Sequence, residues 1–148
     1  MSLKERLSGD AKNALKSGER DRADVVRFLL SQVHNREIEK HGLGKGEELT
    51  DEEALQVLQK EAKRRREAIE LFRKGGRDDL VAKEEKELSF LEAYLPQALS
   101  KDEIRAIVSE FLENGTREFN ALMRETMKKV AGRGDGRIVS EVVREALE

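Results

Sequence analysis

Apolar residues recur every three or four positions along most of the chain, which is the spacing of one face of an α-helix. The first two runs are Leu3, Leu7, Ala11 and Leu15, then Ala23, Val26, Leu29, Leu30 and Val33, with Ile38 one turn further. Gly18 ends the first run, and His41-Gly42 ends the second. The pattern therefore predicts two helices before residue 42.

The rest of the chain continues the helical pattern without any sustained period of two, so no sheet is expected. The later runs are Leu55, Leu58, Ala62, Ile69 and Phe72; Leu80, Val81, Leu88, Leu91 and Leu95; Ile104, Ile107, Val108, Phe111 and Leu112; Phe119, Leu122, Met123, Met127 (or Thr126) and Val130; and Ile138, Val139, Val142 and Leu147. Gly75-Gly76, Pro96, Asn114-Gly115 and the segment 132–136 separate these runs.

These seven runs predict an all-α, multihelical fold divided near Pro96. We expect an N-terminal part, residues 1–96, of four helices in two hairpins. We expect residues 97–148 to form a compact three-helix unit. Thr50 and Ser100 each precede a glutamate by three residues, which predicts a capping box at the start of two of the helices.

Gly42, Gly44 and Gly46 alternate between the second and third runs. They lack the G-x-G-x-x-G spacing, and no strand precedes them, so a plain linker is favoured over a phosphate loop.

Arg65 occupies a position of the third apolar stripe where a hydrophobic residue is expected. An unpaired arginine facing a core would be costly. Arg65 and Glu87 are equally distant from Gly76, so they would face each other across a hairpin. We predict that these two pair; the alternative is that Arg65 lines a ligand site.

Charged residues make up 41% of the 148-residue chain, yet the net charge is only −2. Global charge thus gives no reason to expect nucleic-acid binding, which would need a local patch. There is no cysteine, no apolar leader and no run long enough to cross a membrane. A cytoplasmic protein without a membrane partner is expected.

The segment Gly132–Gly136 separates the last two runs and admits two interpretations. In the structural one, Gly132 adopts the left-handed conformation, and Asp135 caps the next helix by accepting from the Arg137 or Ile138 amide. In the functional one, the helix start and its flanking arginines bind an anion. Asp135 competes with that anion, and no Walker pattern is present. The tripeptide Arg133-Gly134-Asp135 is a poor candidate for an adhesion signal.

Two segments carry a local positive excess that could contact phosphates. Six basic and three acidic residues lie between Gly115 and Arg137, and five basic and two acidic residues lie between Lys60 and Ala68. Each could equally be an ordinary solvated helix face. The candidate nucleic-acid-binding residues are Arg124, Lys128, Lys129, Arg133 and Arg137, with Lys60, Lys63 and Arg64.

No catalytic residue, metal site or cofactor is indicated by the residue types. His34 and His41 could share a helical face, but no third ligand accompanies them.

Several ordered pieces resemble the YqeY family over nearly the whole chain. The most specific are Gly76-Arg77-x-Asp79-Leu80, Tyr94-Leu95-Pro96 and Gly132-Arg133-x-Asp135-Gly136. That family shares a helical module with the C-terminal tail of the B subunit of glutamine-dependent tRNA amidotransferases (GatB). There the tail holds tRNA, while the chemistry lies in another domain.

The resemblance implies a GatB/YqeY-like helical fold and a non-catalytic module associated with tRNA or with an aminoacyl-tRNA-related protein. Two alternatives stay open. One is a protein-interaction adaptor built of helical hairpins. The other is an amidotransferase-like carbon–nitrogen ligase with glutamine as amide donor, for which no catalytic counterpart is recognisable in the sequence. The chain is thus not expected to be a stand-alone enzyme, and its oligomeric state is not predicted.

Overall fold

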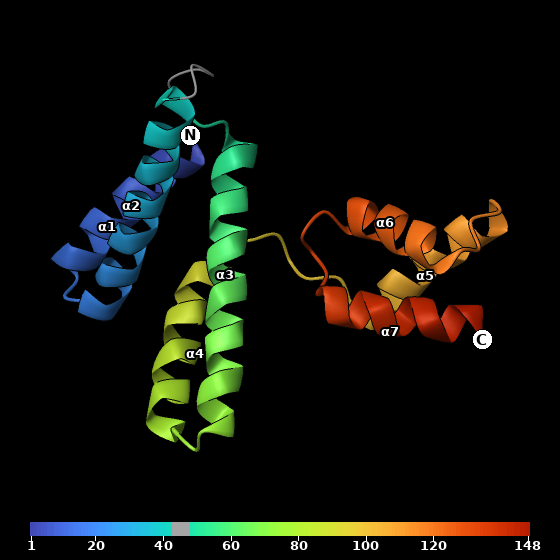
Figure 1. Ribbon diagram of the computed structural model, residues 1–148. Helices are drawn as coiled ribbons and strands as arrows, with labels where there is room; N and C mark the ends of the chain where they lie inside the picture. Colours follow the sequence, from blue (N-terminus) through green and yellow to red (C-terminus); the bar gives the residue numbers. More distant parts are fainter. Residues whose placement is uncertain (43–47) are drawn as a thin grey trace. The chain divides into compact units, whose positions relative to one another are not determined.

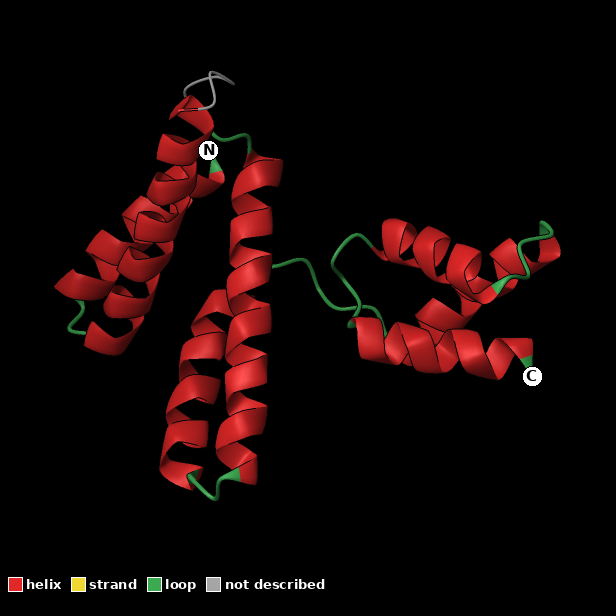
Figure 2. Cartoon of the chain, viewed as in Figure 1, coloured by secondary structure: helices red, strands yellow, loops and turns green. Residues whose placement is uncertain are grey.

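The computed structural model describes residues 1–42 and 48–148, and within these ranges it contains helices and no strand (Figures 1 and 2). The helices are α1 (Leu3–Lys16), α2 (Arg20–Gly42), α3 (Asp51–Lys74), α4 (Asp78–Glu92), α5 (Lys101–Glu113), α6 (Phe119–Val130) and α7 (Gly136–Leu147). The predicted all-α class is confirmed for this part of the chain. Gly42 of the expected linker is the last residue of α2, and residues 43–47, which include Gly44 and Gly46, lie outside the described residues. The chain divides into an N-terminal unit, Met1–Leu95, and a C-terminal unit, Pro96–Glu148.

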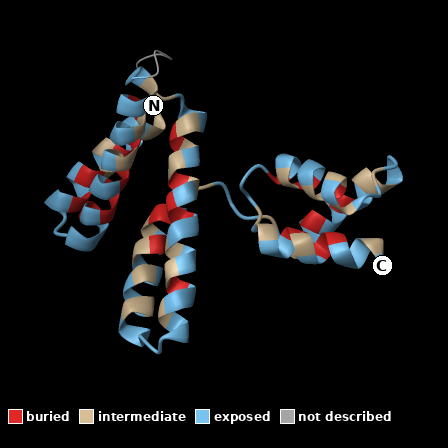
Figure 3. Cartoon of the chain, viewed as in Figure 1, coloured by how far each residue is buried: buried red, intermediate tan, exposed pale blue. Residues whose placement is uncertain are grey.

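In the N-terminal unit, α1 packs along α2 and α3 packs along α4. The two pairs join because α2 contacts both α3 and α4, and α1 contacts α3. The buried residues lie on the facing sides of the helices (Figure 3). They form one core: Leu7, Ala11, Val25, Val26, Leu29, Val33, Ala54, Leu58, Ala62, Ile69, Leu88 and Leu91.

Two residues that the apolar pattern assigned to this core are exposed. Leu15 is 51% exposed, and Ala14 is buried in its place. The face of α1 runs through positions 7, 11 and 14, and one further residue rotates by about 100° out of it. Ile38 is 59% exposed because α2 turns Glu37 inward instead, where Lys4 pairs with its carboxylate at 2.8 Å.

The helix ends follow the predicted signals with two differences. Thr50 and Glu53 form the complete capping box at the start of α3. Ser100 accepts from the Glu103 amide at 3.1 Å, but no return bond from the Glu103 side chain is found among the described residues, so that capping box is only half formed. Helix α4 ends at Glu92, earlier than the expected stop at Pro96.

Arg65 is confirmed as part of a charged contact between α3 and α4. Its guanidinium donates to Glu87, the predicted partner, and also to Glu84 at 3.2 Å. Glu61, one turn earlier on α3, lies 3.3 Å from Arg65 Nε. The Arg65 side chain is 11% exposed and lies near the Phe28 ring. The charge of Arg65 is therefore paired with three carboxylates across and along the hairpin, although its buried Nε makes no hydrogen bond among the described residues.

The C-terminal unit is a three-helix arrangement in which α5, α6 and α7 each contact the other two. Its buried core is Ile104, Val108, Leu122, Val130, Val139, Val142 and Val143. Of the alternatives at positions 126 and 127, Thr126 is the fully buried residue.

No helix among the described residues has the length and apolar character needed to span a bilayer.

Candidate functional site

The turn between α6 and α7 combines two left-handed residues with an N-cap. Ala131 and Gly132 have φ of 48° and 81°, so the reversal begins one residue earlier than the glycine alone suggested. Asp135 Oδ1 accepts from the Arg137 amide at 2.8 Å, as predicted. Gly134 packs on the core, and a β-carbon there would lie 3.5 Å from Ile104, Val130 and Val139. The turn is thus explained by folding alone.

Asp135 decides how an anion could approach this turn. Its carboxylate occupies an amide at the start of α7, where an anion would otherwise bind the helix end. Binding through backbone amides, the functional interpretation of the turn, is therefore disfavoured. Any anion must be held by side chains.

The five predicted residues of the C-terminal unit, called here the C-terminal cation cluster, are Arg124, Lys128, Lys129, Arg133 and Arg137. All five are exposed. Lys128 and Lys129 lie in the last turn of α6, Arg133 in the connecting turn and Arg137 in the first turn of α7. The hairpin therefore brings four of the five to one end of the unit, and Arg124 lies one helical turn further along α6.

Three acidic residues of this unit, Asp102, Glu141 and Glu145, pair with cations outside this cluster. Lys101 lies 3.7 Å from Glu141 and 3.6 Å from Glu145, and Arg105 pairs with Asp102 at 2.6 Å and with Glu145. Within the part of the chain that the structure describes, none of the C-terminal cation cluster forms an ion pair. Arg133 alone is engaged, since its Nε donates to the Gln97 carbonyl at 3.0 Å.

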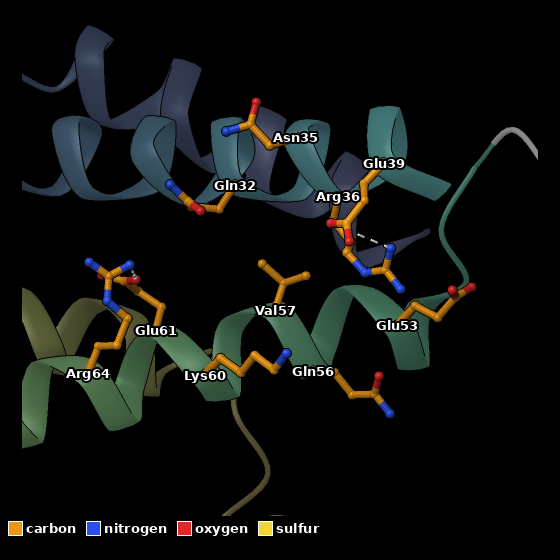
Figure 4. Close-up of a pocket in the computed structure, with 10 residues that line it drawn as sticks. All are labelled: Gln32, Asn35, Arg36, Glu39, Glu53, Gln56, Val57, Lys60, Glu61 and Arg64. Carbon is orange, nitrogen blue, oxygen red and sulfur yellow. Dashed lines mark hydrogen bonds and ion pairs between the residues drawn. The ribbon is translucent and has the colours of Figure 1, made fainter. Parts of the chain in front are cut away.

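The three predicted cations of α3 are separated by the structure into two groups. Lys60 and Arg64 line a cleft of 310 Å³ between α2 and α3 (Figure 4). Lys63 is exposed and does not line the cleft. These cations belong to the N-terminal unit and the cation cluster to the C-terminal one.

The cleft itself was not predicted. Its other lining residues are Gln32, Asn35, Arg36 and Glu39 on α2, and Glu53, Gln56, Val57 and Glu61 on α3 (Figure 4). Sequence patterns could have found it only by showing that the polar side of α2 faces α3, and nothing local indicates that.

The charges of the cleft are unequally engaged. Lys40 pairs with Glu53 at 2.7 Å, and this hydrogen bond, aided by the Thr50 amide, lowers the pKa of Glu53 to about 2. Glu61 contacts both Arg64 and Arg65 at 3.3 Å.

Arg36 is the least satisfied cation of the cleft. Its Nη1 atom is buried and lacks a hydrogen-bond partner among the described residues, with Glu39 3.8 Å away. That separation is too long for a hydrogen bond.

Two of the pieces that carry the family resemblance have structural roles. The Tyr94 hydroxyl donates to Asp10 on α1, and the Arg6 guanidinium lies 4.7 Å from the centre of the Tyr94 ring. Burial, followed by the Asp10 carboxylate, raises the pKa of Tyr94. Gly76 has φ of 71° in the α3–α4 turn, and Arg77 pairs with Asp79 at 3.2 Å. Tyr94 therefore links the segment after α4 to α1, and Gly76, Arg77 and Asp79 shape the start of α4.

Comparison with known proteins gives a family and several relatives. Residues 4–147 match the family described as Yqey-like protein. A protein of Pyrenophora tritici-repentis named altered inheritance of mitochondria protein 41, mitochondrial, is 29% identical over 96% of this chain and 79% of its own length. Its namesake in Lachancea thermotolerans is 35% identical over 84% of this chain and 66% of its own length. An uncharacterised protein of Schizosaccharomyces pombe is 38% identical over 60% of this chain and 68% of its own length.

The expected cytoplasmic location is contradicted by these comparisons, because relatives are named as mitochondrial proteins. The expectation rested on the lack of an apolar leader and of membrane-length apolar runs. Mitochondrial targeting segments are amphipathic and rich in arginine, so the absence of these apolar features does not bear on a mitochondrial location.

The names of these relatives describe inheritance of mitochondria and no reaction. Because the family match extends from residue 4 to residue 147, the chain belongs to the YqeY family.

Proposed function

We propose that this protein is a non-catalytic helical module that binds RNA, with tRNA as the expected class, through the C-terminal cation cluster. The observation that supports this most is the division of charge in the C-terminal unit. Its ion pairs use Lys101 and Arg105, and the five clustered cations keep their charges available. Cations that pair with no neighbour can neutralise phosphates and release counterions.

The manner of binding follows from the side chains available. The C-terminal unit has phenylalanines only at 111 and 119, and both are half-buried. Base stacking on exposed aromatic rings therefore contributes little here. Recognition would rest on shape and on phosphate contacts, which suits a folded RNA of fixed outline.

A salt titration with matched double variants tests the proposal. The full-length protein is mixed with tRNA at several salt concentrations in a filter-binding assay. We expect Arg124→Gln with Lys128→Gln to weaken binding and to reduce the slope of log affinity against log salt by about two, because each lost phosphate contact removes about one unit.

The control removes two cations that already have partners. Lys101→Gln with Arg105→Gln changes the net charge equally but takes away residues that pair with acids. It should leave the salt slope near the wild-type value. Equal effects of the two double variants, or no tRNA binding at low salt, would refute the proposal.

Nuclease treatment distinguishes the RNA-binding proposal from the protein-adaptor alternative. A protein partner that stays bound to the purified full chain after nuclease treatment, with unchanged affinity in the Arg124–Lys128 double variant, would favour an adaptor instead.

A further inference from the structure

The cleft between α2 and α3 carries groups that the proposed tRNA surface does not use. It belongs to the N-terminal unit, and its 310 Å³ is at the lower limit of small-molecule sites. A site of this size accommodates one nucleotide and is too small for a dinucleotide. Its walls are mostly polar, so the occupant must offer hydrogen bonds along most of its length.

Positive charge in the cleft is available, and negative charge is largely neutralised. Glu53 is held by Lys40, and Glu61 by Arg64 and Arg65. Lys60 forms no ion pair within the described ranges, and the buried Arg36 Nη1 has no hydrogen-bond partner there. In the described part of the chain, the only acidic neighbour of this atom, Glu39, lies 3.8 Å away, so an anionic ligand would supply the hydrogen bond that it lacks.

The remaining lining side chains offer contacts to groups other than an anion. The amides of Gln32, Asn35 and Gln56 each offer a donor and an acceptor, which is the pattern that reads the edge of a nucleobase. Glu39 has only the long contact to Arg36 and can accept from hydroxyl groups. Val57 lies between the two helices and provides an apolar surface for a ring, whereas the Asn35 and Gln56 amides lie at opposite rims of the cleft (Figure 4).

Simpler occupants leave part of this set unused. Inorganic phosphate would not engage the amides or Val57. A basic peptide would meet Arg36, Lys60 and Arg64. A ribonucleotide joins one anionic group, two hydroxyls, a flat ring and an amide-like edge in one molecule.

We propose that the α2–α3 cleft binds a ribonucleoside 5′-monophosphate unit, with its phosphate on Arg36 and Lys60, its base against Val57 and within reach of one of the amides, and its ribose 2′-hydroxyl near Glu39. The unit is either a free nucleotide or an unpaired residue of an RNA strand. This site does not depend on the C-terminal cation cluster.

The test is calorimetric titration of the full-length protein with AMP, CMP, GMP and UMP, with dAMP, with inorganic phosphate and with a single-stranded RNA tetranucleotide. We expect at least one ribonucleotide probe to bind more tightly than dAMP and than inorganic phosphate. Binding of a mononucleotide identifies a free ligand, whereas binding of the tetranucleotide alone identifies an unpaired RNA residue. Both results support the site, and absence of binding to every probe overturns it.

Variants connect the binding to the cleft. Lys60→Gln replaces an exposed side chain on α3 and should lower affinity about tenfold while the circular dichroism melting curve stays unchanged. Arg36→Gln should lower it by at least as much. Lys83→Gln removes another exposed cation, on α4 and outside the cleft, and should change affinity less than about twofold.

Nucleotide binding that is indifferent to both cleft variants would overturn the assignment. The Arg124–Lys128 double variant should bind nucleotides like the wild type, so failure of this site and failure of the tRNA surface are distinguishable.

Discussion

Thr126 places a hydroxyl in the core of the C-terminal unit. The residue is fully buried, and its Oγ1 has no hydrogen-bond partner among the described residues. A buried polar group without a partner costs about 1–3 kcal/mol. Thr126→Val keeps the branched shape and removes the hydroxyl, so we expect the free energy of unfolding to rise by about 1 kcal/mol. Urea unfolding followed by circular dichroism measures this, and a loss of stability would show that the hydroxyl has a partner.

Ala131 adopts the left-handed conformation that glycine adopts without strain. Its φ of 48° comes directly before the positive φ of Gly132. The left-handed conformation costs a residue other than glycine about 1–2 kcal/mol. Replacement by glycine removes this cost, but glycine loses more conformational entropy on folding, which offsets part of the gain in stability. We expect Ala131→Gly to raise the melting temperature of the C-terminal unit modestly. Ala131→Val, which is β-branched, should lower it, and the opposite order would exclude backbone strain at this position.

At the scale of helices, the Arg65 contact holds α3 against α4. Arg65→Met would leave Glu61, Glu84 and Glu87 close together without their cation. Removing one partner of a buried ion pair costs about 3–5 kcal/mol, so this variant should be strongly destabilised in urea. Glu87→Gln removes only one of three carboxylates and should cost clearly less. Equal losses would mean that Glu87 carries the whole contact.

The start of α3 should respond to acid through Glu53. Lys40 lowers the pKa of this carboxyl from 4.5 to about 2 in the folded protein. A depressed folded pKa stabilises the protein above the unfolded pKa, and this stabilisation is lost as pH falls through the folded pKa.

We therefore expect the stability difference between wild type and Glu53→Gln to be constant above pH 5 and to shrink between about pH 4.5 and 2. Urea unfolding midpoints of both proteins across this range isolate the contribution of Glu53 to stability. All other carboxyl groups are present in both proteins, so their titration cancels in the difference. A constant difference down to pH 2 would show that Lys40 does not shift the pKa of Glu53.

Local signals predicted the helices better than the surfaces between them. Thr50 and Asp135 were identified as caps because a cap needs only residues within one turn. The Arg65–Glu87 pair followed from counting outward from a glycine turn. Leu15 was misassigned because adjacent residues of a helix point about 100° apart. A stripe counted one position too far therefore names Leu15 where Ala14 is buried. The α2–α3 cleft depends on which helices become neighbours, and no short segment records that.

At the scale of the molecule, each unit has a core of its own. Leu122 is fully buried in the C-terminal core, and its truncation to alanine should cost about 2–5 kcal/mol. We expect Leu122→Ala to speed amide hydrogen exchange in α5, α6 and α7 and to leave the slowest amides of α2 and α3 unchanged. Faster exchange in both units would show that they unfold together.

Asp135 accepts from the Arg137 amide at the start of α7, so an anion near this turn depends on the side chains of the C-terminal cation cluster and not on the helix end. Two of the five are primary amines and three are guanidinium groups. Acetylation neutralises lysine and leaves arginine charged. An acetyltransferase acting on Lys128 and Lys129 would therefore weaken polyanion attraction in two graded steps without abolishing it.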